Sequence, residues 1–249
     1  MGTPAKRQVL TDGKVLVRVT LATAVMRNSP QEEVVWAQRI AAVVPAQRPL
    51  TDPIIWNGST LTVWEWLEGS QVTAADAWKH GNTLRRLHDL AARPVESCVA
   101  DDQLDSARAR LQELQDHRIR EQLASMLDAA TGVLAAVDRG DLVVSHGDAH
   151  DRNLLVLDGV VHLLDFDSAG MAHRHVDVAS GVYAWRLNHQ DESAVCAFLE
   201  GYGEHPDLDR SSLDSLVWVR RLRATCTRAA AGQDVSQRIV ELEATAPHL

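Results

Sequence analysis

Residues 142–170 read LVVSHGDAHDRNLLVLDGVVHLLDFDSAG, a segment in which short apolar runs flank a strongly polar loop. The last two runs are separated by Asp158-Gly159, a dipeptide that favours the two-residue type I′ turn of a β-hairpin. In such a hairpin position 157 pairs with position 160, so Asn153 and Asp165 lie at the same open end of the ribbon. An ideal ladder would point these two side chains to opposite faces. We therefore predict that the strand ends or bends at Asp165.

The polar residues of this segment form a set suited to phosphoryl transfer. Asn153 and Asp165 supply the hard oxygen ligands that Mg²⁺ takes together with phosphate oxygens and water. Asp148, in the loop that starts from the same end of the hairpin, is a carboxylate that can accept a proton from a hydroxyl. The alternative is that all three are turn residues, a role that Asp and Asn also favour. Their joint spacing favours the catalytic interpretation.

The tripeptide His-Gly-Asp at 146–148, with Asn153 five residues after the aspartate and Asp165 twelve further on, resembles the signature of the aminoglycoside phosphotransferase and choline kinase-like family. The resemblance covers nearly the whole chain. It implies an α+β, protein kinase-like fold with a small, shortened antiparallel β lobe and a larger, mainly helical lobe. The implied division is residues 1–69 as nucleotide-binding lobe and hinge, and residues 70–249 as catalytic and acceptor-binding lobe.

The resemblance also implies roles for individual residues. Asp148 would be the catalytic base, and His146 would shape the catalytic loop. Asn153 and Asp165 would bind Mg²⁺. Two further carboxylates, Asp167 and Asp177, would support the loop that binds the metal.

By the same resemblance, ATP or GTP would bind between the lobes. Arg18 stands where the family has a lysine that holds the α and β phosphates, and Glu33, with Glu32 second, would be its helix partner. Arginine pairs with phosphate and carboxylate through parallel hydrogen bonds, so it suits this position. A surface strand residue and an exposed helix acid are the alternative. The hinge resembles residues 64–69, and the expected nucleotide contacts are the main chains of Glu65 and Leu67, with Trp64 as gatekeeper.

The start of the chain departs from the family pattern. Family members have two strands and a phosphate-covering loop before the lysine-bearing strand, whereas 17 residues precede Arg18. A single strand fits this length. We expect that the covering loop is missing, that the true start lies upstream, or that another segment covers the phosphates.

Turn dipeptides and helix caps organise the rest of the chain. Asp12-Gly13 and Asn57-Gly58 favour tight type I′ turns, which predicts hairpins over residues 7–20 and 53–66. Residues 29–32, Ser-Pro-Gln-Glu, combine an N-cap, a proline at the first helical position and a capping-box glutamate. Apolar spacing becomes helical beyond Thr73. The predicted helices cover residues 29–44 and 73–91, segments around 104–114 and 119–140, and stretches around 195–202 and 213–225.

Charge is unevenly distributed. Residues 1–69 hold seven Lys and Arg against six Asp and Glu, whereas residues 70–249 hold 18 against 28, within a net charge of −9. This disfavours nucleic acid as a partner and favours a cationic acceptor, with a solvated acidic surface as the alternative. No apolar run approaches ~18 residues, which argues against a membrane span. The absence of a secretory pattern near the start predicts a cytoplasmic protein.

We therefore predict a kinase that transfers the γ-phosphate of ATP or GTP to a hydroxyl of a small, cationic molecule, with antibiotic resistance through aminoglycoside or related acceptors as the first implication. The alternatives are a metabolite kinase acting on choline, homoserine, fructosamine or a sugar, and a non-catalytic nucleotide-binding pseudokinase. His173-x-His175-x-Asp177 lacks a fourth metal ligand nearby, so we predict a surface turn there. The candidate acceptor-binding carboxylates are Asp151, Glu192, Glu200 and Glu204.

Overall fold

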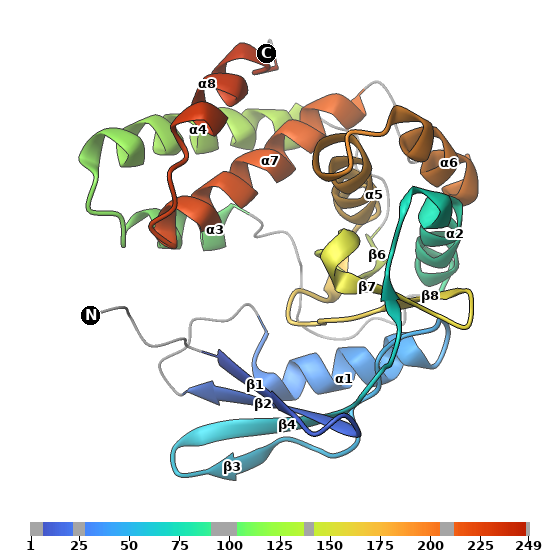
Figure 1. The fold of residues 1–249 in the computed structure, drawn as a ribbon. Coiled ribbons are helices and arrows are strands. Elements are labelled where there is room, and N and C mark those ends of the chain that lie inside the picture. Colours follow the sequence, from blue (N-terminus) through green and yellow to red (C-terminus); the bar gives the residue numbers. More distant parts are fainter. Residues whose placement is uncertain (1–6, 22–27, 91–103, 137–141, 205–211, 248–249) are drawn as a thin grey trace.

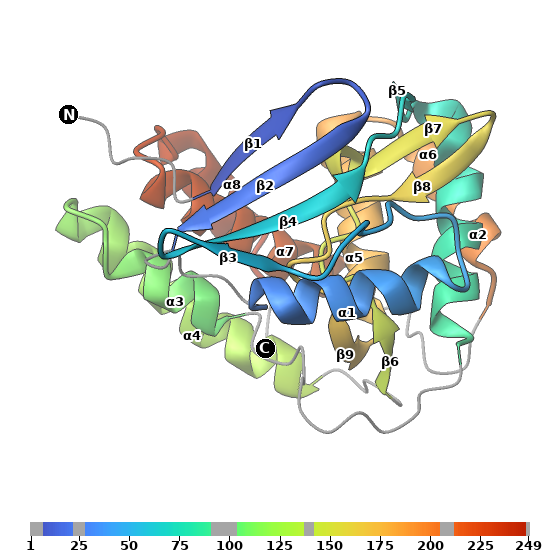
Figure 2. The same ribbon diagram turned by 90° about the horizontal axis from the view of Figure 1, so that it is seen from below.

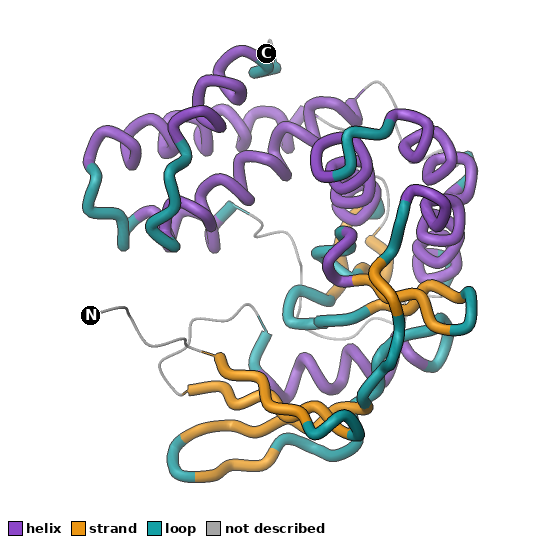
Figure 3. The backbone as a smooth tube through the Cα atoms, viewed as in Figure 1, coloured by secondary structure: helices purple, strands orange, loops and turns teal. Residues whose placement is uncertain are grey.

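The structure, a computed structural model, describes residues 7–21, 28–90, 104–136, 142–204 and 212–247. It has the α+β, protein kinase-like architecture expected from the sequence, with a small antiparallel sheet and one helix set against a larger helical part. Figure 1 shows the sheet and helix α1 below the remaining helices. In Figure 3 the strands gather in the lower and middle part, while the helices other than α1 lie above them.

The small part is built on a four-stranded sheet with the order β1-β2-β4-β3. Its strands are β1 (Arg7–Thr11), β2 (Val15–Leu21), β3 (Ile54–Trp56) and β4 (Ser59–Glu65). Both predicted hairpins are present. Asn57 and Gly58 have φ angles of 48° and 73°, the values of a type I′ turn.

The type I′ prediction at Asp12-Gly13 is wrong. Thr11 pairs with Leu16, which leaves four residues between these paired positions, whereas a two-residue turn would pair Thr11 with Lys14. The Asp12 carboxylate causes this longer turn, because its Oδ1 accepts hydrogen bonds from the main-chain N–H groups of Lys14 (2.8 Å) and Val15 (3.1 Å).

The sheet buries its polar face. Arg18 and Thr20 of β2 are buried, whereas Val17 and Val19, which alternate with them, are only half-buried. Arg18 pairs with Thr62 of β4, which is also buried, so both strands turn the same face inward. Figure 2 shows α1 running alongside β3 and β4. Arg18 therefore lies inside the molecule and not on an outer strand face.

Helix α1 (Pro30–Ala41) has the predicted capping box, with hydrogen bonds between Ser29 and Glu32 in both directions. The segment after it joins the two parts of the molecule by main-chain hydrogen bonds. Leu163 donates to Pro45 (3.0 Å), and Gln47 donates to Leu163 (2.9 Å). These bonds fix the small sheet relative to the strand that leads to Asp165.

Seven α-helices are described in the large part, including all five predicted there. Two helices were not predicted, α5 and α8. The helices pack around two hydrophobic clusters. One cluster includes residues of α1, α2, α5 and α6, and the other includes residues of α3, α4, α7 and α8. None of the described helices is long and apolar enough to cross a membrane. Their bounds are α2 (Ala77–His88), α3 (Asp105–Leu111), α4 (His117–Ala136), α5 (His175–Tyr183), α6 (Glu192–Tyr202), α7 (Leu213–Ala230) and α8 (Ser236–Ala244).

Short strands beneath these helices carry the polar loops. One small sheet has the order β5-β7-β8, and another pairs β6 with β9. Asp158 and Gly159 have φ angles of 50° and 75°, and Leu157 pairs with Val160, which confirms the predicted two-residue hairpin. The strands are β5 (Ser70–Gln71), β6 (Leu142–Ser145), β7 (Leu154–Leu157), β8 (Val160–Leu163) and β9 (Gly170–His173).

A buried histidine in the large core makes stability depend on pH. His80 of α2 is fully buried beside Trp185 and Phe198, and within the described segments neither of its ring nitrogens has a hydrogen-bond partner. Burial lowers the pKa of His80 to about 3. The folded protein then keeps this ring neutral while the unfolded chain takes up a proton below its ordinary pKa of 6.5.

We expect the His80→Leu variant to lose less stability on acidification. Between pH 7 and pH 5 the His80 contribution to the free energy of unfolding falls by about 2 kcal/mol in the unmodified protein and is absent in the variant. Urea titrations at the two pH values measure this difference. The exposed His117→Leu is the control and should keep the original dependence. Equal pH dependence in His80→Leu and the unmodified protein would contradict the expectation.

Candidate active site

A buried carboxylate of α5 holds the loop between β6 and β7. Oδ2 of Asp177 accepts hydrogen bonds from Ser145 Oγ (2.9 Å) and the main-chain N–H of His146 (2.8 Å), and Oδ1 accepts from the N–H of Gly147 (2.8 Å). His88 of α2 places Nε2 3.0 Å from Oδ2. The start of the loop is therefore bonded to the helical core at several points.

The prediction of a surface turn at residues 173–177 is wrong. His175 and Asp177 belong to α5 and are buried, because apolar side chains surround this helix within the main core. Burial raises the pKa of Asp177, but the hydrogen bond and charge of His88 and the charge of His146 outweigh it and lower the pKa. Asp177 therefore remains an ionised acceptor for the loop.

Gly147 and His146 shape the same loop. Gly147 has a φ of 79°, and a Cβ on it would lie 1.9 Å from the main-chain oxygen of Ser168, so only glycine fits there. His146 is buried, with Nε2 2.8 Å from the main-chain oxygen of Leu164, while Nδ1 accepts from the N–H of Asp148 (3.3 Å). This histidine links the Asp148 loop to the segment before Asp165.

Asp148 is accessible and surrounded by cations. Its side chain is 29% exposed, and Oδ1 accepts a hydrogen bond from Nη2 of Arg220 at 2.5 Å. Nε2 of His150 lies 3.5 Å from Oδ2. Burial raises the pKa of Asp148, but Arg220, His150 and the charge of Arg223 outweigh it and hold the pKa well below its usual range. Burial lowers the pKa of His150, but its bonds to Asp148 and Asp151 raise it to about 9.

Asn153 and Asp165 lie at the open end of the β7–β8 hairpin, as the register predicts. The N–H of Leu164 donates to the main-chain oxygen of Asn153 (2.9 Å), and Asp165 has a φ of 62°, so the chain bends at the predicted residue. Nδ2 of Asn153 donates to the main-chain oxygen of Asp148 (3.0 Å). Its Oδ1 is therefore the atom left to act as a ligand.

This donor set fits a magnesium ion. Asn153 Oδ1 and the 37% exposed Asp165 carboxylate are hard oxygen ligands, and Mg²⁺ commonly takes one or two carboxylates beside phosphate oxygens and water. No group of three or more His, Cys, Asp or Glu side chains in the described part of the chain could hold a metal. Phosphate oxygens and water would complete the shell. Bound here, the ion would neutralise phosphate charge.

Arg18 joins the sheet of the small part to this metal end. Its Nη1 lies 2.5 Å from Glu33 Oε1 and 3.2 Å from Asp165 Oδ1. Arg18 and Glu33 are both buried, so neither is the surface residue of the alternative interpretation. Glu32 instead bonds to Ser29 at the start of α1. The arginine position thus places a guanidinium beside the carboxylate expected to bind metal.

The segment expected to be the hinge begins with the last two residues of β4. Trp64 is fully buried, its ring is stacked at 6.4 Å on Phe166, and it lies 4.8 Å from the Arg18 guanidinium. The main-chain N–H of Glu65 donates to Arg48 (3.0 Å), and its carbonyl accepts from Gln47 Nε2 (3.0 Å). Leu67 is half-buried. The main-chain N–H and the main-chain carbonyl of Glu65 thus both have hydrogen-bond partners within the protein.

The loop that carries Asp165 is tied to the residues before α1. The N–H of Asn28 donates to the main-chain oxygen of Asp167 (3.1 Å), and Nδ2 of Asn28 donates to Ala169 (2.7 Å). The Asp167 carboxylate accepts from Ser168 Oγ (3.1 Å). These bonds place Asp167 in a loop anchored to the small part.

One of the four candidate acceptor carboxylates, Asp151, lies in the loop that carries Asp148. Asp151 Oδ1 accepts from Asn188 Nδ2 (2.8 Å), and Oδ2 lies 3.3 Å from His189 Nε2. His150 bridges Asp151 and Asp148. The other three lie elsewhere on α6 or just after it: Glu192 pairs with Arg186, Glu200 is exposed, and the main-chain oxygen of Glu204 accepts from Arg85.

The polar residues of this site that sequence reasoning missed include His150, Gln47 and Arg220. His150 could have been identified from the sequence, because it lies only two residues after Asp148 in the same polar loop. No sequence pattern indicated Gln47 or Arg220. Gln47 Oε1 accepts from Arg18 (3.3 Å) while its Nε2 donates to Glu65, and Arg220 comes from α7, 72 residues after Asp148.

The fold and this arrangement define a class of protein: a phosphotransferase of protein kinase-like architecture that uses a hydroxyl as acceptor. The sequence model of the phosphotransferase enzyme family matches residues 6–213, and the chain belongs to that family. The solved structures that share its fold include aminoglycoside phosphotransferases and choline kinases. No curated protein matches it in sequence.

Several solved structures share the fold at low identity. A microcompartment-associated aminopropanol kinase is 17% identical with a TM-score of 0.66, over 96% of this chain and 89% of the other. An amicoumacin kinase in complex with AMP-PNP, Ca²⁺ and Ami is 16% identical with a TM-score of 0.64, over 98% and 87%. An aminoglycoside-3′-phosphotransferase of type VIII is 19% identical with a TM-score of 0.62, over 88% and 93%.

Proposed function

We propose that this kinase transfers the γ-phosphate of ATP or GTP, in the presence of Mg²⁺, to a hydroxyl of a small cationic acceptor. The observation that carries the proposal is the contact of Arg18 with both Glu33 and Asp165. This contact brings Arg18, expected to bind phosphate, beside Asp165, expected to bind the metal. Arg18 belongs to residues 1–69 and Asp165 to residues 70–249. Nucleotide would then bind between residues 1–69 and residues 70–249, with its phosphates directed at Asn153 and Asp165.

Three features support a cationic acceptor such as an aminoglycoside or an amino alcohol. Residues 70–249 carry the excess of acidic side chains. Asp151 is held beside the catalytic loop by Asn188 and His189. Similar structures include an aminopropanol kinase and an aminoglycoside-3′-phosphotransferase, whose named acceptors carry both amine and hydroxyl groups. An acceptor amine near Asp151 would direct its hydroxyl toward Asp148.

The test is release of ADP or GDP by the purified chain with Mg²⁺, across aminoglycosides, other cationic antibiotics, choline-like amines, amino alcohols and sugars. We expect one class of amine-bearing acceptor to stimulate release, and EDTA or the Asp148→Asn variant to abolish the stimulation. Phosphorylated acceptor, identified by mass spectrometry, would establish the reaction. Nucleotide binding without turnover on any acceptor would favour a pseudokinase, and turnover on neutral sugars alone would overturn the cationic acceptor.

A further inference from the structure

A largely covered arginine from α7 reaches the Asp148 carboxylate. Nη2 of Arg220 donates to Asp148 Oδ1 at 2.5 Å, and Nε donates to Ser180 Oγ at 3.2 Å. Its guanidinium carbon lies 5.2 Å from the ring centroid of Tyr183. The arginine side chain is only 11% exposed. Contacts with α5 therefore hold the guanidinium in a defined position beside Asp148.

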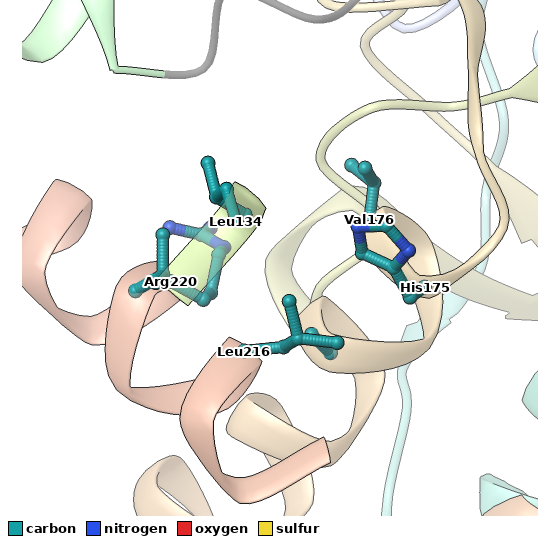
Figure 4. A pocket seen from close by; sticks show the side chains of 7 residues that line it. Leu134, His175, Val176, Leu216 and Arg220 are labelled. Carbon is teal, nitrogen blue, oxygen red and sulfur yellow. The ribbon is translucent and has the colours of Figure 1, made fainter. Parts of the chain in front are cut away.

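Arg220 also lines a small pocket. The pocket lies between α4, α5 and α7, and Figure 4 shows Arg220 and His175 on opposite sides of it, with Leu134 and Leu216 completing the wall. Arginine has five N–H donors, and the bonds to Asp148 and Ser180 use two of them. The guanidinium can thus bind a further anionic oxygen without leaving its contacts with α5.

The proposed reaction brings such an oxygen close to Asp148, the carboxylate that Arg220 contacts. A hydroxyl bonded to Asp148 lies about 3 Å from its carboxylate, and the reacting phosphorus lies roughly 3 Å further on. As the acceptor oxygen bonds to the γ-phosphorus, the bond from phosphorus to the bridging oxygen breaks and its electron pair leaves with ADP. The hydroxyl proton passes to Asp148. The carboxyl group is then neutral, and the Arg220 charge faces the newly formed phosphate ester.

We propose that Arg220 is a further catalytic residue, which binds an oxygen of the phosphoryl group during its transfer from nucleotide to acceptor. The inference rests on the proposed kinase function. The transferring group spreads negative charge over its peripheral oxygens, so a fixed guanidinium stabilises it more than it stabilises bound ATP. A purely structural ion pair between α7 and the loop is the competing explanation.

The experiment compares Arg220→Met and Arg220→Lys with the adjacent Arg221→Met in the full chain. Arg221 bonds to Glu241 of α8, so it controls for loss of an arginine ion pair on the same helix. We expect Arg220→Met to lower kcat by about 10²- to 10³-fold with little change in KM for ATP. Arg220→Lys should recover part of kcat, and Arg221→Met should keep it. Ethylguanidinium added to Arg220→Ala should also restore part of the rate.

Binding of ADP with aluminium fluoride and Mg²⁺ separates catalysis from structure. This complex imitates the transferring phosphoryl group, so Arg220→Met should bind ADP normally but lose the added affinity given by aluminium fluoride. Unchanged kcat in Arg220→Met would overturn the role of Arg220 but not the kinase proposal. Equal added affinity from aluminium fluoride in the variant and the unmodified protein would do the same. Absence of turnover by the unmodified chain on every acceptor would overturn the kinase proposal and this inference with it.

Discussion

Replacement of Asp148 by asparagine should lower kcat by roughly 10³-fold and leave the dissociation constant for ATP or GTP within about twofold. Asparagine keeps the shape of the side chain but cannot accept the hydroxyl proton. The nucleotide contacts proposed at Arg18, Asn153 and Asp165 belong to other segments, so binding should persist. Acceptor-stimulated ADP or GDP release and nucleotide titration measure the two quantities.

The matched control for this variant is Asp158→Asn. Asp158 is exposed in the β7–β8 turn with a φ of 50°, a conformation that asparagine also tolerates. Its kcat should equal that of the unmodified chain. If Asp148→Asn retained more than a tenth of the original kcat, Asp148 would not be the base of this reaction.

The Asp177→Asn substitution should destabilise the fold and reduce catalysis together. The amide can accept hydrogen bonds through one atom only, so at least one of the hydrogen bonds from Ser145, His146 and Gly147 is lost. We expect the free energy of unfolding to fall by about 3 kcal/mol, since an unsatisfied buried donor costs about 1 to 3 kcal/mol and charge-assisted bonds are also lost. A displaced Asp148 should lower kcat by about 10²-fold.

Urea unfolding and turnover, both measured at a temperature where the variant is folded, check this expectation. The control is Asp191→Asn, because Asp191 is the N-cap of α6 and accepts from Ala194 (3.0 Å) at a half-buried position. Asparagine is an equally good N-cap, so that variant should change stability by less than about 0.5 kcal/mol. Equal stability of Asp177→Asn and Asp191→Asn would show that Asp177 does not brace the loop.

The arrangement of Asn153 and Asp165 was predictable because one local turn sets it. A two-residue turn at Asp158-Gly159 determines the pairing of the whole β7–β8 hairpin, and every residue of that hairpin is close in sequence. The bend at Asp165 was predictable because an ideal ladder would point Asn153 and Asp165 to opposite faces, where they could not bind one ion. The Asp12-Gly13 turn shows the limit of the same rule, since hydrogen bonds to the Asp12 side chain lengthened the loop.

The burial of particular faces was not predictable from local pattern. Alternation along β2 separates Arg18 from the valines, but it does not say which face is covered. Packing of the sheet on α1 and of Trp64 on Phe166 buries the polar face. Similarly, His175 and Asp177 have the polar spacing of a surface turn, yet α5 lies in the middle of the core.

The motif at residues 146–165 carried the resemblance to the family and, through it, the fold class, while local patterns indicated the hairpins and most of the helices. These local patterns depend on turn chemistry, capping and short-range register, all of which act over a few residues. The positions of Arg220, Gln47 and His88 depend instead on how α7, the segment after α1 and α2 pack around the loop. Such contacts join residues far apart in sequence, and no local periodicity records them, because packing of the entire core determines which distant side chains meet.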